Sequence, residues 1–219
     1  MRKQALATAA LLAVAALTLT ACGGGADSSD KPPVTVVSEQ PGSDKAAIVL
    51  DTPFEKPDLV LTDTNGKKYD FRKETAGKAT LVYFGYTSCP DVCPTTMSNI
   101  AVAKKQLPKD QQDALRVVFI TTDPVRDTSA ALGKWLKGID PQIVGLTGAF
   151  PTVQAAARTV GITIEPPYKD KNGRMVSTHG TQVIAFSPKS DDGYVVYTED
   201  TLVDDYAKDL PKLLKGAKP

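Results

Sequence analysis

Residues 79–107 read ATLVYFGYTSCPDVCPTTMSNIAVAKKQL, and this stretch decides the fold of the chain. Its first part, residues 79–86, is a continuous β-rich run, which is typical of a strand buried on both faces of a sheet. In residues 93–107 apolar side chains recur at helical spacing, which predicts an amphipathic helix. These side chains are Met97, Ile100, Ala103 and Leu107. Cys89 therefore falls in a strand-to-helix turn, and Cys93 in the first turn of the helix.

Comparable patterns predict the remaining elements of the domain. Residues 59–71 are expected to form a β-hairpin around an Asn65-Gly66 turn. Further strands are expected at residues 115–121, 142–146, 181–186 and 194–197, and further helices at 127–135, 153–160 and 203–214. This order, βαβαβα followed by a hairpin and a helix, predicts an α/β fold with a central mixed sheet and helices on both of its faces.

The N-terminal segment is predicted to direct export. Residues 1–21 combine a cationic start, an apolar stretch and small residues at the end, as secretory signal peptides do. Leu19-Thr20-Ala21-Cys22 resembles a lipobox, so we expect lipidation at Cys22 and a cell-membrane anchor on the extracytoplasmic face. The alternative is an ordinary signal peptide with an incidental Cys22. Residues 22–47 are expected to be a flexible tether, and residues 48–219 the globular domain, with its packed part beginning near Phe54.

The charge of the chain excludes one class of partner. The full sequence carries a formal net charge of +1, which becomes −1 when residues 1–21, with Arg2 and Lys3, are removed. A protein that binds nucleic acid through its phosphates normally presents a strongly basic surface. We therefore expect no nucleic-acid partner.

A long polar segment, residues 163–180, ends at the only histidine of the chain, His179. It is interrupted by Pro166-Pro167 and is predicted to be a loop insertion. Loops of this length in compact domains are usually functional or disordered. His179 lies just ahead of the expected strand at 181–186, and the loop is long enough to fold over the start of the cysteine helix.

The two cysteines favour redox or soft-metal chemistry. A helix N-terminus stabilises thiolates, so we expect both sulfurs to be partly ionised and near the surface. A structural disulfide is the alternative in an exported protein. Closing a five-residue loop would stabilise the fold by only ~2 kcal/mol, which favours a reversible dithiol instead. If His179 approaches Cys89 and Cys93, the donors suit Cu(I), and they can also hold Cu(II) or Zn(II).

Residues 85–97, which read GYTSCPDVCPTTM, strongly resemble the signature of the Sco (SenC) copper metallochaperones. Residues 123–128, DPVRDT, look like the second motif of that family, and His179 matches its third. The resemblance covers residues 50–214 and implies a thioredoxin-like fold with Cys89, Cys93 and His179 as the copper ligands. It also implies that the protein supplies copper to the copper-site subunit of cytochrome c oxidase, with Cys89 and Cys93 as a redox pair.

Several acidic positions receive no ligand role in this interpretation. Many family members carry an aspartate directly before the histidine, where this chain has Thr178. Asp91 and Asp123 are assigned no contact with a metal. Asp127 is equally well explained as a helix cap, since Asp127 and Thr128 both offer caps to the helix expected at residues 127–135. Arg126 is equally well explained as the partner of a carboxylate.

Two other functions fit parts of the sequence. A thiol–disulfide oxidoreductase that reduces cysteines of an oxidase subunit would use Cys89 and Cys93 without His179. The three-residue spacer between Cys89 and Cys93 departs from the Cys-x-x-Cys motif of thioredoxins. A peroxidase is a weaker variant of this hypothesis, because Tyr86 stands three residues before Cys89, where peroxiredoxins usually carry threonine or serine. The third possibility is a lipid-anchored scaffold with an inert disulfide.

Overall fold

The computed structural model describes residues 46–219, so the predicted signal peptide, Cys22 and most of the tether lie outside the described part. The strands are β1 (Ala47–Phe54), β2 (Val60–Asp63), β3 (Lys68–Asp70), β4 (Thr80–Gly85), β5 (Arg116–Thr121), β6 (Val144–Thr147), β7 (Tyr168–Lys169), β8 (Met175–Val176), β9 (Val183–Phe186) and β10 (Gly193–Tyr197). The helices are α1 (Phe71–Thr75), α2 (Val92–Lys105), α3 (Lys109–Ala114), α4 (Ser129–Lys137), α5 (Phe150–Thr159) and α6 (Val203–Leu213).

The central sheet is mixed, as predicted, with strand order β1-β10-β9-β4-β5-β6-β2-β3. Strands β4, β5 and β6 are parallel, whereas β9, β10 and β1 add to the other side of β4 in antiparallel pairs. The predicted hairpin forms β2 and β3 and extends the sheet by pairing β2 with β6. All residues of β4 are buried, because helices cover the sheet on both faces.

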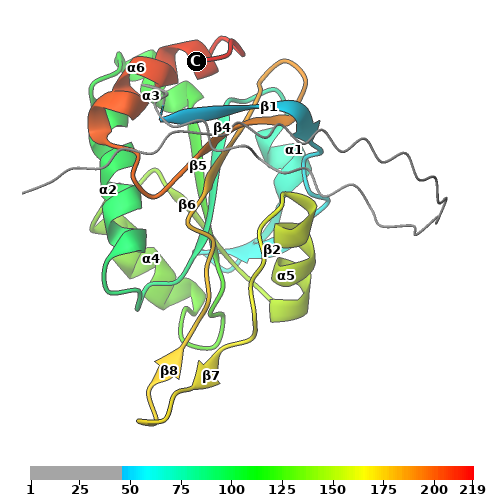
Figure 1. Ribbon diagram of the computed structural model, residues 1–219, viewed down its shortest axis with the longest axis vertical. Helices are drawn as coiled ribbons and strands as arrows, with labels where there is room; N and C mark the ends of the chain where they lie inside the picture. The colour runs from blue at the N-terminus through cyan, green and yellow to red at the C-terminus, as the bar shows by residue number, and fades with distance from the viewer. Residues whose placement is uncertain (1–45) are drawn as a thin grey trace, which may run out of the picture. The chain divides into compact units, whose positions relative to one another are not determined.

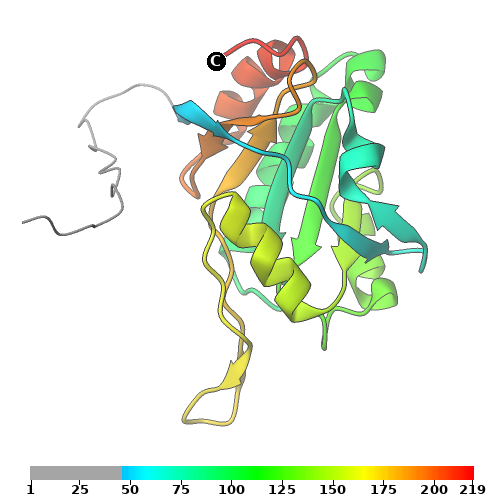
Figure 2. The same ribbon diagram turned by 90° about the vertical axis from the view of Figure 1, so that its right-hand side faces the viewer.

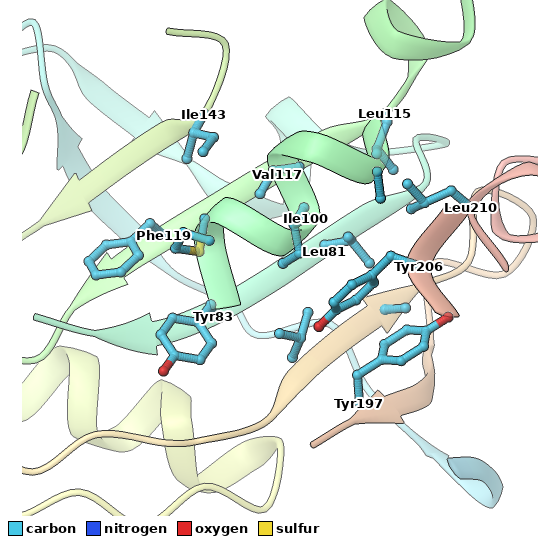
Figure 3. Close-up of a cluster of buried hydrophobic side chains, with 14 of the residues drawn as sticks. Leu81, Tyr83, Ile100, Leu115, Val117, Phe119, Ile143, Tyr197, Tyr206 and Leu210 are labelled. Carbon is cyan, nitrogen blue, oxygen red and sulfur yellow. The ribbon is translucent and has the colours of Figure 1, made fainter. Parts of the chain in front are cut away.

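Helices α2, α4 and α6 cover one face of the sheet, and α1 and α5 cover the other (Figures 1 and 2). Two apolar clusters fill the two interfaces, one on each side of the sheet. Figure 3 shows part of the first cluster, where side chains of β4 and β5 meet those of α2 and α6. Within residues 46–219, none of the helices combines the length and the apolar character that crossing a bilayer requires.

Parallel pairing of β4 and β5 brings two loops to the same edge of the sheet. Gly85 is in register with Thr121, and the Thr122 N–H donates to the Gly85 carbonyl at 2.7 Å. The antiparallel strand β9 lies on the other side of β4, with Val183 opposite Tyr83. Residues that follow β4, follow β5 and precede β9 therefore meet at one edge, although they are far apart in sequence.

Three expectations about the elements were wrong. The packed part begins before Phe54, because β1 starts at Ala47 and pairs with β10. Of the two residues expected to cap the next helix, Asp127 does not; the side chain of Thr128 does, by accepting the Ala131 N–H at that N-terminus. Residues 163–180 are not a plain loop, since β7 and β8 form a small hairpin that projects beyond the sheet (Figure 1). Helices α1 and α3 were not predicted.

Candidate metal centre

The two cysteines lie where β4 turns into α2. The Cys89 N–H donates to the carbonyl of Tyr86 at 3.2 Å, which closes the turn after the strand. Helix α2 begins at Val92, so Cys93 lies in its first turn, as predicted. The Cys93 N–H points at the Cys89 sulfur, with a nitrogen–sulfur distance of 3.5 Å. Both residues are free thiols.

His179 reaches the same place from the other side of β4. Its Nε2 is 3.9 Å from the sulfur of Cys89, and its Nδ1 is 2.9 Å from the carbonyl of Gly180. Because a carbonyl can only accept, Nδ1 carries a proton, and in the neutral form of the ring Nε2 is the nitrogen with a lone pair facing the sulfur. The imidazole also packs on the ring of Tyr86, with 5.4 Å between ring centroids.

Cys89, Cys93 and His179 thus form a compact group of donor atoms. One sulfur from each cysteine and one nitrogen of the histidine all lie within 4.8 Å of one another. The predicted convergence of these three side chains is therefore present in the described part of the chain. Two sulfurs and an imidazole are soft donors, which suit Cu(I), and no fourth side-chain donor of the kind that Zn(II) prefers belongs to this group of described residues.

The expectation that both sulfurs are near the surface was wrong, and so was the expectation that Cys93 is partly ionised. Cys93 is 0% exposed and Cys89 only 7% exposed. Burial raises the pKa of the Cys93 thiol to about 12, although a hydrogen bond from Tyr83 lowers this pKa in part. The Tyr83 hydroxyl donates to the Cys93 sulfur at 3.5 Å. In the metal-free protein, desolvation therefore raises the pKa of Cys93 by more than the helix N-terminus lowers it.

Close packing holds the Cys93 sulfur. A Cβ atom added to Gly85 would lie 2.9 Å from that sulfur, 2.6 Å from the ring of Tyr83 and 3.2 Å from the ring of Phe119. Only a residue without a side chain leaves room for the cysteine here. The packing of these side chains therefore fixes the position of the sulfur.

The second motif lies beside the donor atoms without joining them. Asp123 and Asp127 are both buried, and neither carboxylate belongs to the Cys89–Cys93–His179 group. Arg126 forms an ion pair with Asp123, as expected of an arginine near a carboxylate. Asp127 accepts hydrogen bonds from Thr87 and Thr121, which explains why it is unavailable as a helix cap. Asp91 is exposed and makes no side-chain cap at α2.

Sequence reasoning missed several residues that hold this site. Thr178 was given no structural contact from the sequence, but its hydroxyl accepts the Glu165 N–H at 2.6 Å and donates to the Glu165 carbonyl at 2.9 Å. It thereby ties together the two ends of the loop that precedes His179. Tyr83 and Ser177 were also missed, because nothing in their local sequence indicates which distant groups they contact.

Comparisons with known proteins agree with this geometry. A family model described as SCO1/SenC matches residues 50–215. A relative from Stutzerimonas stutzeri is 32% identical over 178 residues, which cover 80% of this chain and 85% of that protein. An SCO2-like protein from Rickettsia conorii is 45% identical over 91 residues, which cover 42% of this chain and 43% of that protein. The structure of Bradyrhizobium japonicum ScoI with copper bound aligns with a TM-score of 0.61 and 31% identity, covering 74% of this chain and 98% of that one.

Proposed function

The chain belongs to the SCO1/SenC family, and on that basis we propose that it is an extracytoplasmic metallochaperone that delivers copper to the dinuclear copper site of cytochrome c oxidase. The observation that carries this proposal is the group formed by Cys89, Cys93 and His179 at one edge of a thioredoxin-like sheet. We assign all three as copper ligands. Copper is the cargo in this scheme, and the Bradyrhizobium relative supports the choice of metal because its solved structure contains copper.

A site with so few donors is suited to transfer. Three side chains leave an ion incompletely surrounded, so an acceptor with additional ligands can compete for it. Cys93 is fully buried and Cys89 slightly exposed, so the acceptor would approach from the side of Cys89 and His179. Oxidation of the two thiols to a disulfide releases two electrons and two protons and removes both sulfur donors. Copper affinity would therefore depend on the redox state of the pair.

Location follows from the N-terminal sequence. We propose that residues 1–21 are removed, that Cys22 is lipidated, and that residues 22–47 tether the domain to the outer face of the cell membrane. A flexible tether of some 25 residues spans ~25–30 Å on average. That reach would let the domain visit the copper-site subunit of a membrane-bound oxidase.

A transfer assay tests the proposed function directly. The reduced chain is loaded with one equivalent of Cu(I) and mixed with the metal-free copper-binding domain of the oxidase subunit, and the copper content of each protein is measured after separation. We expect copper to move to the acceptor from the parent protein. A chain that binds Cu(I) but never yields it to this acceptor would contradict delivery. Cys93→Ser, which removes one sulfur donor, serves as the loading control.

A thiol–disulfide oxidoreductase is the second candidate, and one feature of the structure favours it. Cys89 receives the Cys93 N–H and is the more exposed sulfur, as suits an attacking thiol with a buried resolving partner. In this reaction Cys89 would attack the disulfide of an oxidase subunit, and Cys93 would then release the reduced substrate by forming the Cys89–Cys93 disulfide. Full reductase activity in His179→Ala without copper would favour this function over metal delivery.

A further inference from the structure

Residues 121–127, which we call the anchor segment, contact both loops that carry the donor atoms. On the cysteine side, the carboxylate of Asp127 accepts the Thr87 N–H at 2.9 Å and also accepts the Thr87 hydroxyl. The Thr121 hydroxyl donates to the same carboxylate at 2.6 Å. Thr87 is two residues before Cys89, so Asp127 fixes the backbone from which the first sulfur extends.

On the histidine side, Asp123 has the matching role. Its carboxylate accepts the Ser177 hydroxyl at 2.8 Å and forms an ion pair with Arg126. Arg126 in turn donates to Ser177 Oγ at 3.2 Å and to the Met175 carbonyl at 3.5 Å. Ser177 is two residues before His179, so this network holds the backbone from which the imidazole extends.

Burial makes these contacts strong constraints. Asp123 and Asp127 are each 1% exposed, and a carboxylate at such depth is stable only when hydrogen bonds replace its lost hydration. Both aspartates obtain those bonds from the two donor-bearing loops and from the anchor segment itself. If either loop moved away, a buried charge would lose partners, which is why the loops are held in place.

Tyr86 provides a second link between the two halves of the site. Its ring packs against the imidazole of His179 on one side, and the Arg126 guanidinium lies 6.0 Å from the ring centroid. Farther from the imidazole, the side-chain amide of Gln154 in α5 donates to the Ile164 carbonyl, whereas Glu165 bonds only to Thr178 within the loop. The Asp123–Arg126–Ser177 network thus attaches the loop by hydrogen bonds two residues before His179.

Resting on the proposed copper function, we propose that the anchor segment sets the spacing between the sulfur and nitrogen donors without touching the ion. Asp127 is the positioning residue for Cys89, and Asp123, with Arg126, is the positioning residue for His179. The two aspartates therefore act through different ligands, and the effects of replacing them are separable.

A double-mutant cycle with His179→Ala tests this separation. Cu(I) affinity is measured by competition with a chromophoric chelator. Loss of an outer contact to a metal ligand typically costs 10–100-fold in affinity, and we expect about a tenfold loss for Asp123→Asn in the parent. In the His179→Ala background the same substitution should have no further effect. Asp127→Asn should weaken binding in both backgrounds, because the cysteines remain ligands in each.

Ser177→Ala provides a milder variant if Asp123→Asn folds poorly. It removes the two hydrogen bonds of the Ser177 hydroxyl, to Asp123 and from Arg126, and leaves the Asp123–Arg126 ion pair intact, so it should reproduce the dependence on His179 with a smaller loss. Ser187→Ala is its matched control, since Ser187 is also buried but bonds only to backbone groups of its own turn. Equal losses for Asp123→Asn with and without His179 would overturn the assignment of Asp123 to the histidine.

A measurement without copper keeps the two proposals distinguishable. In the metal-free reduced protein, amide hydrogen exchange should accelerate at residues 175–180 in Asp123→Asn and at residues 86–91 in Asp127→Asn. Faster exchange at both loops in each variant, or at neither, would refute the anchor. Failure of the parent to bind Cu(I) would refute the proposed function and leave the exchange result as the test of the anchor.

Discussion

The substitution Gly85→Ala tests how tightly the fold packs around the Cys93 sulfur. Gly85 is the last residue of β4, and the added methyl group would lie 2.6 Å from the Tyr83 ring and 2.9 Å from the sulfur. Real Cβ atoms essentially never approach other atoms more closely than 3.0 Å, so these neighbours must move. Restoring a 3.4 Å contact to the sulfur requires a displacement of about 0.5 Å.

The neighbours have little space to move into, because Tyr83, Cys93 and Phe119 are all at most 1% exposed. Overpacking of a filled core costs about 1–3 kcal/mol. A shift of about 0.5 Å is also the tolerance within which a designed metal site keeps its geometry. We therefore expect Gly85→Ala to lower the free energy of unfolding by about 1–3 kcal/mol and to weaken Cu(I) binding about tenfold.

Urea unfolding of the reduced, metal-free protein measures the first quantity, and chelator competition measures the second. Gly138→Ala is the control, because Gly138 is exposed, has a helical backbone, and its added Cβ would meet only the Trp135 carbonyl at 3.3 Å. That variant should stay within about 0.5 kcal/mol of the parent. Parental stability and parental affinity in Gly85→Ala would refute the packing argument.

Three further predictions address other parts of the structure. Tyr83→Phe removes the hydrogen bond to Cys93, so the sulfur should donate electron density to copper more strongly and the Cu(II)/Cu(I) midpoint potential should fall. An unchanged potential in a redox titration would exclude an effect of the Tyr83 hydroxyl on the metal. Iodoacetamide alkylates the thiolate form of cysteine, and the pKa of the fully buried Cys93 is raised to about 12. At pH 8 the reagent should therefore modify Cys89 first, and it should modify Cys93 only on unfolding or well above pH 9, which peptide mass spectrometry would reveal. Lys104 and Asp140 form a buried ion pair at 3.0 Å, so Lys104→Met should lower the free energy of unfolding in urea by about 3–5 kcal/mol. The double variant with Asp140→Leu should recover part of this stability, and a double variant less stable than the single one would contradict the coupling.

The sequence predicted the central elements because their signals are local. The continuous apolar run of β4 and the helical spacing in α2 each lie within one element, and the structure confirms both. The family assignment and the α/β fold class are likewise confirmed. The approach of His179 was predicted from its place before a strand, and the antiparallel pairing of β9 with β4 explains it.

The failures share a physical cause, namely contacts between residues far apart in the sequence. Strand β1 is largely exposed and is defined by its pairing with β10, so its own residues carry little alternation. A helix start predicts ionised cysteines, but the burial of Cys93 depends on side chains from β4 and β5. Asp127 is locally suited to cap a helix, yet hydrogen bonds from Thr87 and Thr121 occupy its carboxylate. The roles of Cys89, Cys93 and His179 as ligands remain a prediction.

Anaerobic Cu(I) titration of the reduced protein, followed by X-ray absorption spectroscopy, tests those roles most directly. We predict one tightly bound copper ion per chain, coordinated by two sulfurs and one nitrogen, with the nitrogen lost and the affinity greatly reduced in His179→Ala. Unchanged affinity and coordination in that variant, or binding that survives replacement of both cysteines by serine, would contradict a copper site built from Cys89, Cys93 and His179.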